Sequence, residues 1–281
     1  MSTPEHTPAP EPTLAALVTV YHKIDPEHLR ECLRSLGGQT RPADQLIVVE
    51  DGPLSPELNA VLEEELDTIA GVERVRLPHN VGAGPASAAG LERVTATYLA
   101  RLDADDVAFP QRFELQLAHL EQFPEIDVLG TALAEFSGTT DNVVGVRTLP
   151  EYHQAIAKYA AINSPVNNPS VMMKTAAVRA VGGYRDVHLM EDYDLYARLV
   201  AGGYTFHNLP QPLTYFRLSN DVFARRTGPE MLAAEREMQR NLMRYGLVSK
   251  PRALGNFVAR STYRALPTAV LKKAHHTLFH R

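Results

Sequence analysis

Four short apolar runs alternate with helix-like segments between residues 14 and 106 of this 281-residue chain. Each run has the length and composition of a buried strand, and the runs occupy residues 14–21, 45–49, 72–77 and 98–102. The segments between them, residues 26–36, 56–69 and 86–96, are predicted to be helices. Because parallel strands are usually joined through a helix, the alternation predicts an α/β fold with a mostly parallel sheet flanked by helices.

Polar side chains follow the carboxyl ends of these runs, where such sheets bind their ligands. The run that begins at Tyr98 ends in three carboxylates within four residues, Asp103, Asp105 and Asp106. Carboxylates this close repel one another, so a site that keeps them ionised favours a cation with oxygen ligands, such as Mg²⁺ or Mn²⁺. The simpler alternative is a polar turn in which an Asp caps a helix beginning at Pro110.

The second half of the chain is predicted to continue with both strands and helices. Expected strands occupy residues 128–136, 170–173, 204–208 and 213–218. Expected helices occupy residues 110–122, 152–160, 176–181, 191–201 and, as the clearest part of a helical C-terminal extension, 231–245.

Charge is distributed unevenly along the chain, whose formal net charge is −5. Residues 238–281 contain nine Lys and Arg and no acid, while the first 237 residues hold 19 basic and 33 acidic residues. A body with this acidic excess is a poor general nucleic-acid binder, whereas the basic end favours an anionic surface. The single Cys32 excludes an internal disulfide, which fits a reducing compartment such as the cytoplasm.

The termini carry no sign of a membrane span. No apolar run reaches 18 residues, and residues 1–12 contain four prolines, so they are expected to form a flexible tail and not a signal peptide. Within residues 270–278, apolar side chains fall on one helical face beside Lys272 and Lys273. That pattern fits an amphipathic helix on an anionic membrane and, equally, a helix docked on the body.

Nine stretches, in this order, resemble the family 2 glycosyltransferases, which are inverting transferases of the GT-A fold. They are Val18-Thr19-Val20-Tyr21, Gln39-Thr40, Ile47-Val48-Val49-Glu50-Asp51-Gly52, Asn80-Val81-Gly82, Arg101-Leu102-Asp103-Ala104-Asp105-Asp106, Pro110-Gln111-Arg112-Phe113 with Gln116, Asn168-Pro169-Ser170-Val171, Gly182-Gly183-Tyr184 and Glu191-Asp192-Tyr193-Asp194-Leu195. Each motif alone is weak, but the ordered set is specific. Two positions on the acceptor side depart from the family pattern: Asn168 stands where His is common, and Tyr196 where Trp is common.

The resemblance implies the organisation and activity of the chain. Residues 13–218 would form the GT-A domain, with a nucleotide-binding half (13–106) and an acceptor half (107–218), and residues 219–281 a basic helical extension. The chain would transfer a sugar from a nucleotide sugar, expected to be a UDP-sugar, to a saccharide or lipid-linked acceptor in cell-surface polysaccharide synthesis. Its cofactor would be Mg²⁺ or Mn²⁺. The protein would be located in the cytoplasm or on the inner face of the cell membrane.

The resemblance also implies residues that bind the nucleotide. Asp51 would accept a hydrogen bond from the uracil ring, with Tyr21 packing nearby. Asn80 would contact the nucleotide or hold its own loop through an Asx turn. Arg101 would reach the base, ribose or pyrophosphate, or else pair with a neighbouring carboxylate. Arg217 would contact the pyrophosphate, unless the loop that follows it is a mobile lid.

Four carboxylates are expected to carry the chemistry. By resemblance Asp105 would ligate the metal directly, and Asp103 would contact the ribose, the metal or a metal-bound water. Asp192 would be the base that takes the proton from the acceptor hydroxyl, supported by Glu191. The competing interpretation is that Glu191 and Asp192 only stabilise the first turn of a helix.

Two other functions compete with the transferase. Asp103-Ala104-Asp105-Asp106-Val107 superficially fits the nucleophile motif of haloacid-dehalogenase-like phosphohydrolases, although that motif normally follows the first strand. The third hypothesis is a nucleotide-sugar-binding module without catalysis. No motif identifies the sugar, the acceptor or the linkage.

Overall fold

The computed structural model of the protein describes residues 12–218 and 229–264. Nine strands form one sheet: β1 (Leu14–Val20), β2 (Gln45–Glu50), β3 (Val72–Arg76), β4 (Tyr98–Arg101), β5 (Val107–Ala108), β6 (Val128–Phe136), β7 (Val143–Arg147), β8 (Met172–Lys174) and β9 (Phe206–Arg217). The helices are α1 (Pro26–Gly37), α2 (Pro56–Leu66), α3 (Ala83–Arg93), α4 (Arg112–Gln122), α5 (His153–Ala160), the 3₁₀ turn η1 (Asn168–Ser170), α6 (Thr175–Ala180), α7 (Glu191–Ala201), α9 (Pro229–Arg244) and α10 (Lys250–Arg264).

The strand order is β3-β2-β1-β4-β8-β6-β9-β5, with β7 paired to β6. The first four strands in this order are parallel, as the helix-joined pattern predicts. From β8 onward the pairs are antiparallel except β6 with β9. The chain winds outward from β1 to β3 and then returns to the other side of β1, so the space between β1 and β4 is a topological switch point.

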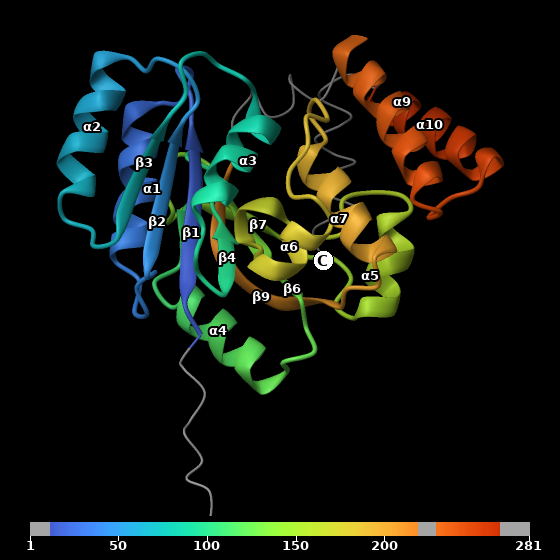
Figure 1. Ribbon diagram of the computed structural model, residues 1–281, viewed down its shortest axis with the longest axis horizontal. Helices are drawn as coiled ribbons and strands as arrows, with labels where there is room; N and C mark the ends of the chain where they lie inside the picture. Colours follow the sequence, from blue (N-terminus) through green and yellow to red (C-terminus); the bar gives the residue numbers. More distant parts are fainter. Residues whose placement is uncertain (1–11, 219–228, 265–281) are drawn as a thin grey trace, which may run out of the picture.

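Alternation along β1 divides the core into two layers. Its even-numbered residues, such as Leu14 and Val18, pack with buried side chains of α1, α2 and α4. Its odd-numbered residues, such as Ala15 and Leu17, pack with α3, α6 and α7. Figure 1 shows α1 and α2 on one side of the β1–β3 sheet and α3 on the other. A strand buried on both faces has to be apolar throughout, which explains why this run lacks alternation in its sequence.

The first two helices, α1 and α2, each begin directly after a side chain that caps them. Asp25 accepts the backbone N–H groups of Glu27 and His28 at 2.9 and 3.3 Å, and Pro26 occupies the first turn of α1. Ser55 plays the same part for α2, accepting from the Leu58 N–H. These bonds satisfy donors that have no partner inside the helix, so each helix starts directly after its strand-end loop.

Three strand predictions need correction. β5 and β7 were not predicted, since β5 has two residues and β7 is a partly exposed edge with no alternating pattern. The separate strands expected at 204–208 and 213–218 are one strand, β9. Pro210 and Pro212, which have no backbone N–H to donate, lie where the register between β9 and β6 shifts.

The described part of the C-terminal extension is helical, as expected. α9 and α10 pack against each other and against α7 through an apolar cluster that includes Met190, Met231, Met238 and Leu242. Figure 1 shows the pair at the edge of the molecule, beyond α7 and away from β1–β3. The predicted helix over residues 270–278 and most of the loop after Arg217 lie outside the described residues.

Candidate functional site

The predicted site residues gather at the carboxyl edge of the sheet around the β1–β4 switch point. Asp103 and Asp105 follow β4, Asp51 follows β2, and Glu191 and Asp192 open α7. The acids of α7 lie close enough to those after β4 for the charge of Asp103 to help raise the pKa of Glu191. The structure therefore brings together carboxylates that are almost ninety residues apart in the sequence.

Close backbone packing holds α7 against α3. A Cβ atom on Gly84 would lie 2.3 Å from the Arg185 carbonyl oxygen and 3.1 Å from the Glu191 Cβ. Only glycine allows this approach, which places the loop after β3 beside the acids of α7. Leu189, two residues before α7, has a φ of 60°, a left-handed conformation that is uncommon for a leucine.

Asp103 is held by protein groups on one side and reaches solvent on the other. Its side chain is 36% exposed, and Oδ1 accepts from Asn168 Nδ2 at 3.2 Å. The Arg101 guanidinium lies 3.7 Å from the same oxygen. A carboxylate that is partly exposed yet held in place is suited to bind a ligand entering from solvent.

Asp105 differs from Asp103 in its surroundings. The side chain is half-buried, and among the described residues no hydrogen bond reaches its carboxylate. Its backbone carbonyl accepts from Arg217 Nε at 2.9 Å. The loop is therefore fixed through its backbone, while the carboxylate keeps its capacity to accept.

Asp106 turns inward instead of capping the next helix. It is buried, and Oδ1 accepts from the Arg217 backbone N–H at 2.8 Å. Burial raises its pKa well above the usual range, and the charges of Asp105 and Asp103 act in the same direction. The capping role considered for the acids near Pro110 is wrong, because α4 begins at Arg112 with no side-chain cap.

Asp51 anchors the loop after β3. Its carboxylate accepts from Asn80 Nδ2 at 2.9 Å and from the backbone N–H groups of Val81 and Gly82 at 2.7 and 3.1 Å. Gly52 has a φ of 84°, and a Cβ there would lie 2.5 Å from the Asn80 backbone nitrogen. The two loops of the nucleotide half are thus joined directly, and the Asn80 side chain ties its loop to Asp51.

Two buried arginines contact protein groups at the site, although Nε of Arg101 has no hydrogen-bond partner among the described residues. Arg101 is 3% exposed, donates to the Leu17 carbonyl, lies over the Tyr184 ring and forms the expected pair with the Asp103 carboxylate, while its contact with a nucleotide stays a prediction. Arg217 is 6% exposed, and its guanidinium reaches the Asp105 and Gly138 carbonyls and the Glu31 carboxylate. Arg217 thereby holds the acidic loop through the Asp105 backbone carbonyl. Tyr21 is half-buried and contacts the His22 ring just after β1.

The two acids of α7 have different environments. Burial raises the pKa of Glu191 to about 8, with the neighbouring Asp192 charge as the next cause, so Glu191 tends to hold a proton near neutral pH. Asp192 Oδ1 accepts from the Tyr193 backbone N–H at 2.6 Å, as an acid in the first turn of a helix does. A carboxyl group whose pKa is raised to about 8, beside a second acid in the first turn of the helix, is an arrangement suited to proton transfer.

Sequence reasoning missed several supporting side chains. Arg112 is fully buried and donates to three carbonyls, those of Arg101, Pro169 and Val171, and burial lowers its pKa to about 9. Tyr196 donates to Asn168, so the two acceptor-side departures from the family pattern contact each other. The sequence shows that Arg112 and Gln116 have the i and i+4 spacing of a helical contact. It does not show which carbonyl groups Arg112 contacts, because these belong to other elements.

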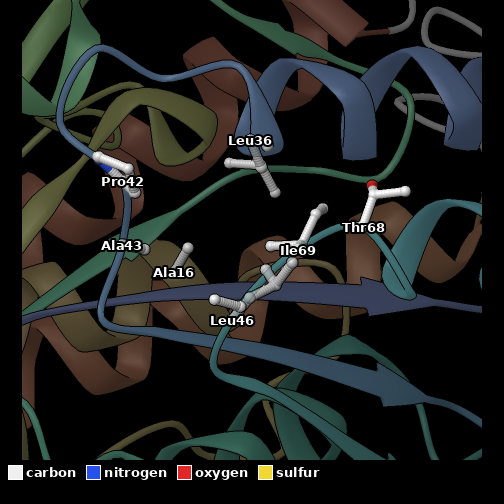
Figure 2. A pocket seen from close by; sticks show the side chains of 9 residues that line it. Ala16, Leu36, Pro42, Ala43, Leu46, Thr68 and Ile69 are labelled. Atoms are coloured by element: carbon white, nitrogen blue, oxygen red, sulfur yellow. The ribbon is translucent and has the colours of Figure 1, made fainter.

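Two cavities in the described part of the protein are lined by none of the predicted site residues. One, of about 200 Å³, is lined by small and apolar side chains such as Ala16, Leu36, Leu46 and Ile69, as Figure 2 shows. It lies near the amino ends of β1 and β2, opposite the site. Another, of about 210 Å³, lies between α3 and the Gly182–Tyr184 turn. The first has no acidic side chain in its lining and the second has one, Glu92, so neither offers the cluster of carboxylates expected of a metal site.

The donor set after β4 fits a hard divalent cation. Two partly exposed carboxylates two residues apart offer oxygen ligands of the kind that Mg²⁺ and Mn²⁺ prefer. Within residues 12–218 and 229–264, no three His, Cys, Asp or Glu side chains converge on one metal position. Two protein ligands suffice for Mg²⁺ where substrate phosphates and water complete the shell.

An α/β sheet with carboxylates at its switch point is typical of nucleotide-dependent enzymes. Residues 16–180 match the model of Glycosyl transferase family 2. The chain belongs to this family of glycosyltransferases. The phosphohydrolase alternative has no support, since the acidic motif follows β4 and not the first strand.

Curated relatives are similar over almost their whole length. The chain is 37% identical to an uncharacterised glycosyltransferase of Haemophilus influenzae, over 95% of this chain and 99% of that one. It is 33% identical to the amylovoran biosynthesis glycosyltransferase AmsE of Erwinia amylovora, over 92% and 96%. It is 29% identical to the UDP-Gal:α-D-GlcNAc-diphosphoundecaprenol β-1,3-galactosyltransferase of Escherichia coli, over 92% and 93%.

Solved structures show the same GT-A fold. TarS 1–349 of S. aureus, in complex with UDP-GlcNAc, has a TM-score of 0.66 at 14% identity, over 95% of this chain and 75% of that one. The chain covers only 45% of the longer TarS structure. PcManGT of Pyrobaculum calidifontis, in complex with GDP-Man and Mn²⁺, has a TM-score of 0.61 at 15% identity, over 95% and 80%.

Proposed function

We propose that this glycosyltransferase transfers a sugar, with inversion, from a UDP-sugar to a saccharide or lipid-linked acceptor, with a divalent cation at Asp103 and Asp105. The observation that carries the proposal is the convergence of these two acids with Glu191 and Asp192 at one edge of the sheet. Nucleotide-diphosphate chemistry needs a cation, and inversion needs a base, and this edge offers groups for both.

In the donor half, Asp105 and Asp103 would ligate the Mg²⁺ or Mn²⁺ ion. When bound, the ion supplies Lewis-acid stabilisation of the diphosphate leaving group. Arg217 would act from behind by holding the Asp105 backbone. Asp51 and Asn80 would shape the loop that receives the nucleotide, with Tyr21 at its side.

In the acceptor half, Asp192 would take the proton of the acceptor hydroxyl while that oxygen attacks the anomeric carbon. Glu191, whose pKa is raised by burial to about 8, would hold a proton near neutral pH beside this base. General base catalysis of this kind contributes about 10²–10⁴-fold to the rate.

The choice of donor and acceptor rests on the relatives. The E. coli relative is named for UDP-Gal and a diphosphoundecaprenol-linked acceptor, and AmsE for amylovoran biosynthesis. A lipid-linked acceptor would require the protein to work at a membrane surface. Among the described residues no helix is long and apolar enough to span a membrane. Leu254 and Val258 on α10 are 65% and 54% exposed, and we propose that they contact the membrane beside Lys250 and Arg252.

The test is turnover of a panel of UDP-sugars with lipid-linked saccharide acceptors and Mn²⁺. Release of UDP measures the rate, and NMR of the product gives its anomeric configuration. We expect an inverted product, and a fall of at least about 100-fold in kcat for Asp192→Asn. Asp67→Asn, an exposed acid at the end of α2, is the matched control. Retention of configuration, or full activity of Asp192→Asn, would refute the assigned mechanism.

A further inference from the structure

A chain of hydrogen bonds leads from the interior of α7 to Asp103. Tyr196 Oη lies 2.8 Å from Asn168 Oδ1, and Asn168 Nδ2 lies 3.2 Å from Asp103 Oδ1. The three residues come from α7, from η1 and from the loop after β4, so this series of hydrogen bonds joins both halves of the domain. We propose that Tyr196 and Asn168 are positioning residues that hold the Asp103 carboxylate in the orientation required by metal and donor.

The chemistry of the three groups fixes the direction of the chain. An ionised carboxylate only accepts hydrogen bonds, so Asn168 must turn its NH₂ group toward Asp103. Its amide oxygen then faces Tyr196, whose hydroxyl must donate. Each group therefore determines the orientation of the next, and Tyr196 acts on Asp103 through Asn168.

Burial makes this chain stiff at its inner end. Tyr196 is fully buried, with 0% exposure, whereas the Asp103 side chain is 36% exposed. A partly exposed Asp has several accessible rotamers, and a ligand that needs one of them must overcome that freedom. Asn168, which is partly buried and is itself held by the buried Tyr196, removes part of this freedom before the ligand arrives.

The chain also couples the two sets of acids. Tyr196 lies four residues after Asp192, which puts both side chains on the same side of α7 one turn apart. The helix that presents the proposed base therefore also contributes the hydroxyl that orients Asp103. This inference rests on the proposed function, since it assumes that Asp103 serves a metal–nucleotide site.

The test is calorimetry of UDP binding with Mn²⁺ for Tyr196→Phe, Asn168→Ala and the double variant. Tyr196→Phe removes one hydroxyl and should weaken UDP binding about three- to tenfold. In the Asn168→Ala background the same change should have no further effect, because the tyrosine acts only through the amide. A purely structural role would lower stability without this dependence.

The control is Tyr193→Phe on the same helix. Tyr193 is also buried, but its hydroxyl donates to the Ala160 carbonyl at 2.7 Å, away from Asp103. It should reduce thermal stability while leaving the UDP affinity unchanged. Unchanged affinity in Tyr196→Phe, or an equal loss in the Asn168→Ala background, would overturn the inference.

A separate readout distinguishes this inference from the proposed function. If the wild type binds no UDP with Mn²⁺, the proposed donor site fails. Crystal structures of the wild type and Tyr196→Phe then still test the positioning. One Asp103 conformer in the wild type and several in the variant support it, and the same single conformer in both overturns it.

Discussion

Glu191 and Asp192 stand next to each other in the first turn of α7, where two charged carboxylates would repel. Burial disfavours the charge on Glu191, and the charge on Asp192 disfavours it further, so the pKa of Glu191 rises to about 8. The unfolded chain has no such burial and releases this proton near pH 4.5, the ordinary value. Between about pH 4.5 and pH 8, Glu191 therefore carries a proton in the folded protein that it has lost in the unfolded chain.

This retained proton makes the stability of the metal-free protein depend on pH. Because the folded state binds the extra proton, stability is greatest below the unfolded pKa and falls as pH rises toward 8. Glu191→Gln should remove this part of the decline, so the variant should lose less Tm than the wild type between pH 5 and pH 8. Each kcal/mol of difference corresponds to roughly 2–4 °C.

Thermal melts of both proteins across that range check the prediction. The control is Glu237→Gln, an exposed glutamate of α9, which should follow the wild type. A wild type and a Glu191→Gln variant with parallel curves would show that Glu191 is not protonated in the folded protein.

Residue identity predicted the location of the acids but not all of their partners. Asp103, Asp105 and Asp51 follow strands whose carboxyl ends share one edge, so their proximity follows from topology. The three donors to Asp51 and the guanidinium contacts of Arg217 depend on loop conformation, which strand periodicity does not encode. Nucleotide contact by these residues stays a prediction.

At the scale of elements, α7 is held from two sides. Asp194, at 0% exposure, accepts from Arg198 Nε at 2.8 Å within the helix. Its other oxygen accepts from Asn241 of α9 and from Tyr245 just beyond it, at 3.1 and 2.7 Å. Arg198 also donates to two carbonyls of the turn that carries Tyr184. The C-terminal extension thus supports the helix that presents Glu191 and Asp192.

Asp194→Asn should destabilise the protein by about 3 kcal/mol, because it leaves a buried arginine without its counter-charge. Urea unfolding measures this change. Arg41→Ala is the control, since it removes a partly exposed ion pair with Asp44 and should cost no more than about 1 kcal/mol. Equal losses in both variants would contradict a supporting role for the buried network.

Helices and strands were predictable where their sequences show a clear apolar run or a helical or strand period. The strand–helix units through β4 follow from apolar runs and caps, and all of them are present. β5 is too short for any period, β7 lies at an edge, and β9 continues through two prolines that normally end a strand. The sequence thus predicted the parallel half well and the mixed half only in part.

The whole molecule is electrically asymmetric, with an acidic excess in the first 237 residues and only basic charge after Met238. Figure 1 places α9 and α10 together at one margin of the molecule, on the side away from α4. The basic residues of α10 would attract an anionic leaflet by charge, and the exposed apolar pair beside them would hold the helix on the membrane by apolar contact.

Vesicle sedimentation tests this orientation. The protein should bind phosphatidylglycerol vesicles better than phosphatidylcholine vesicles, and less at high salt. The double variant Leu254→Ser/Val258→Ser should bind about tenfold more weakly, while Leu115→Ser, a partly exposed leucine of α4, should bind like the wild type. Equal binding by all three proteins would exclude α10 as the membrane contact.

The most direct test of the central claim is calorimetric titration of UDP into the wild type and Asp105→Ala, with and without Mn²⁺. The proposed donor site predicts binding that needs Mn²⁺ and is lost in Asp105→Ala but kept in Asp141→Ala, an exposed acid of the β6–β7 turn. UDP binding that is equal with and without metal, and equal in Asp105→Ala, would contradict a cation at Asp103 and Asp105.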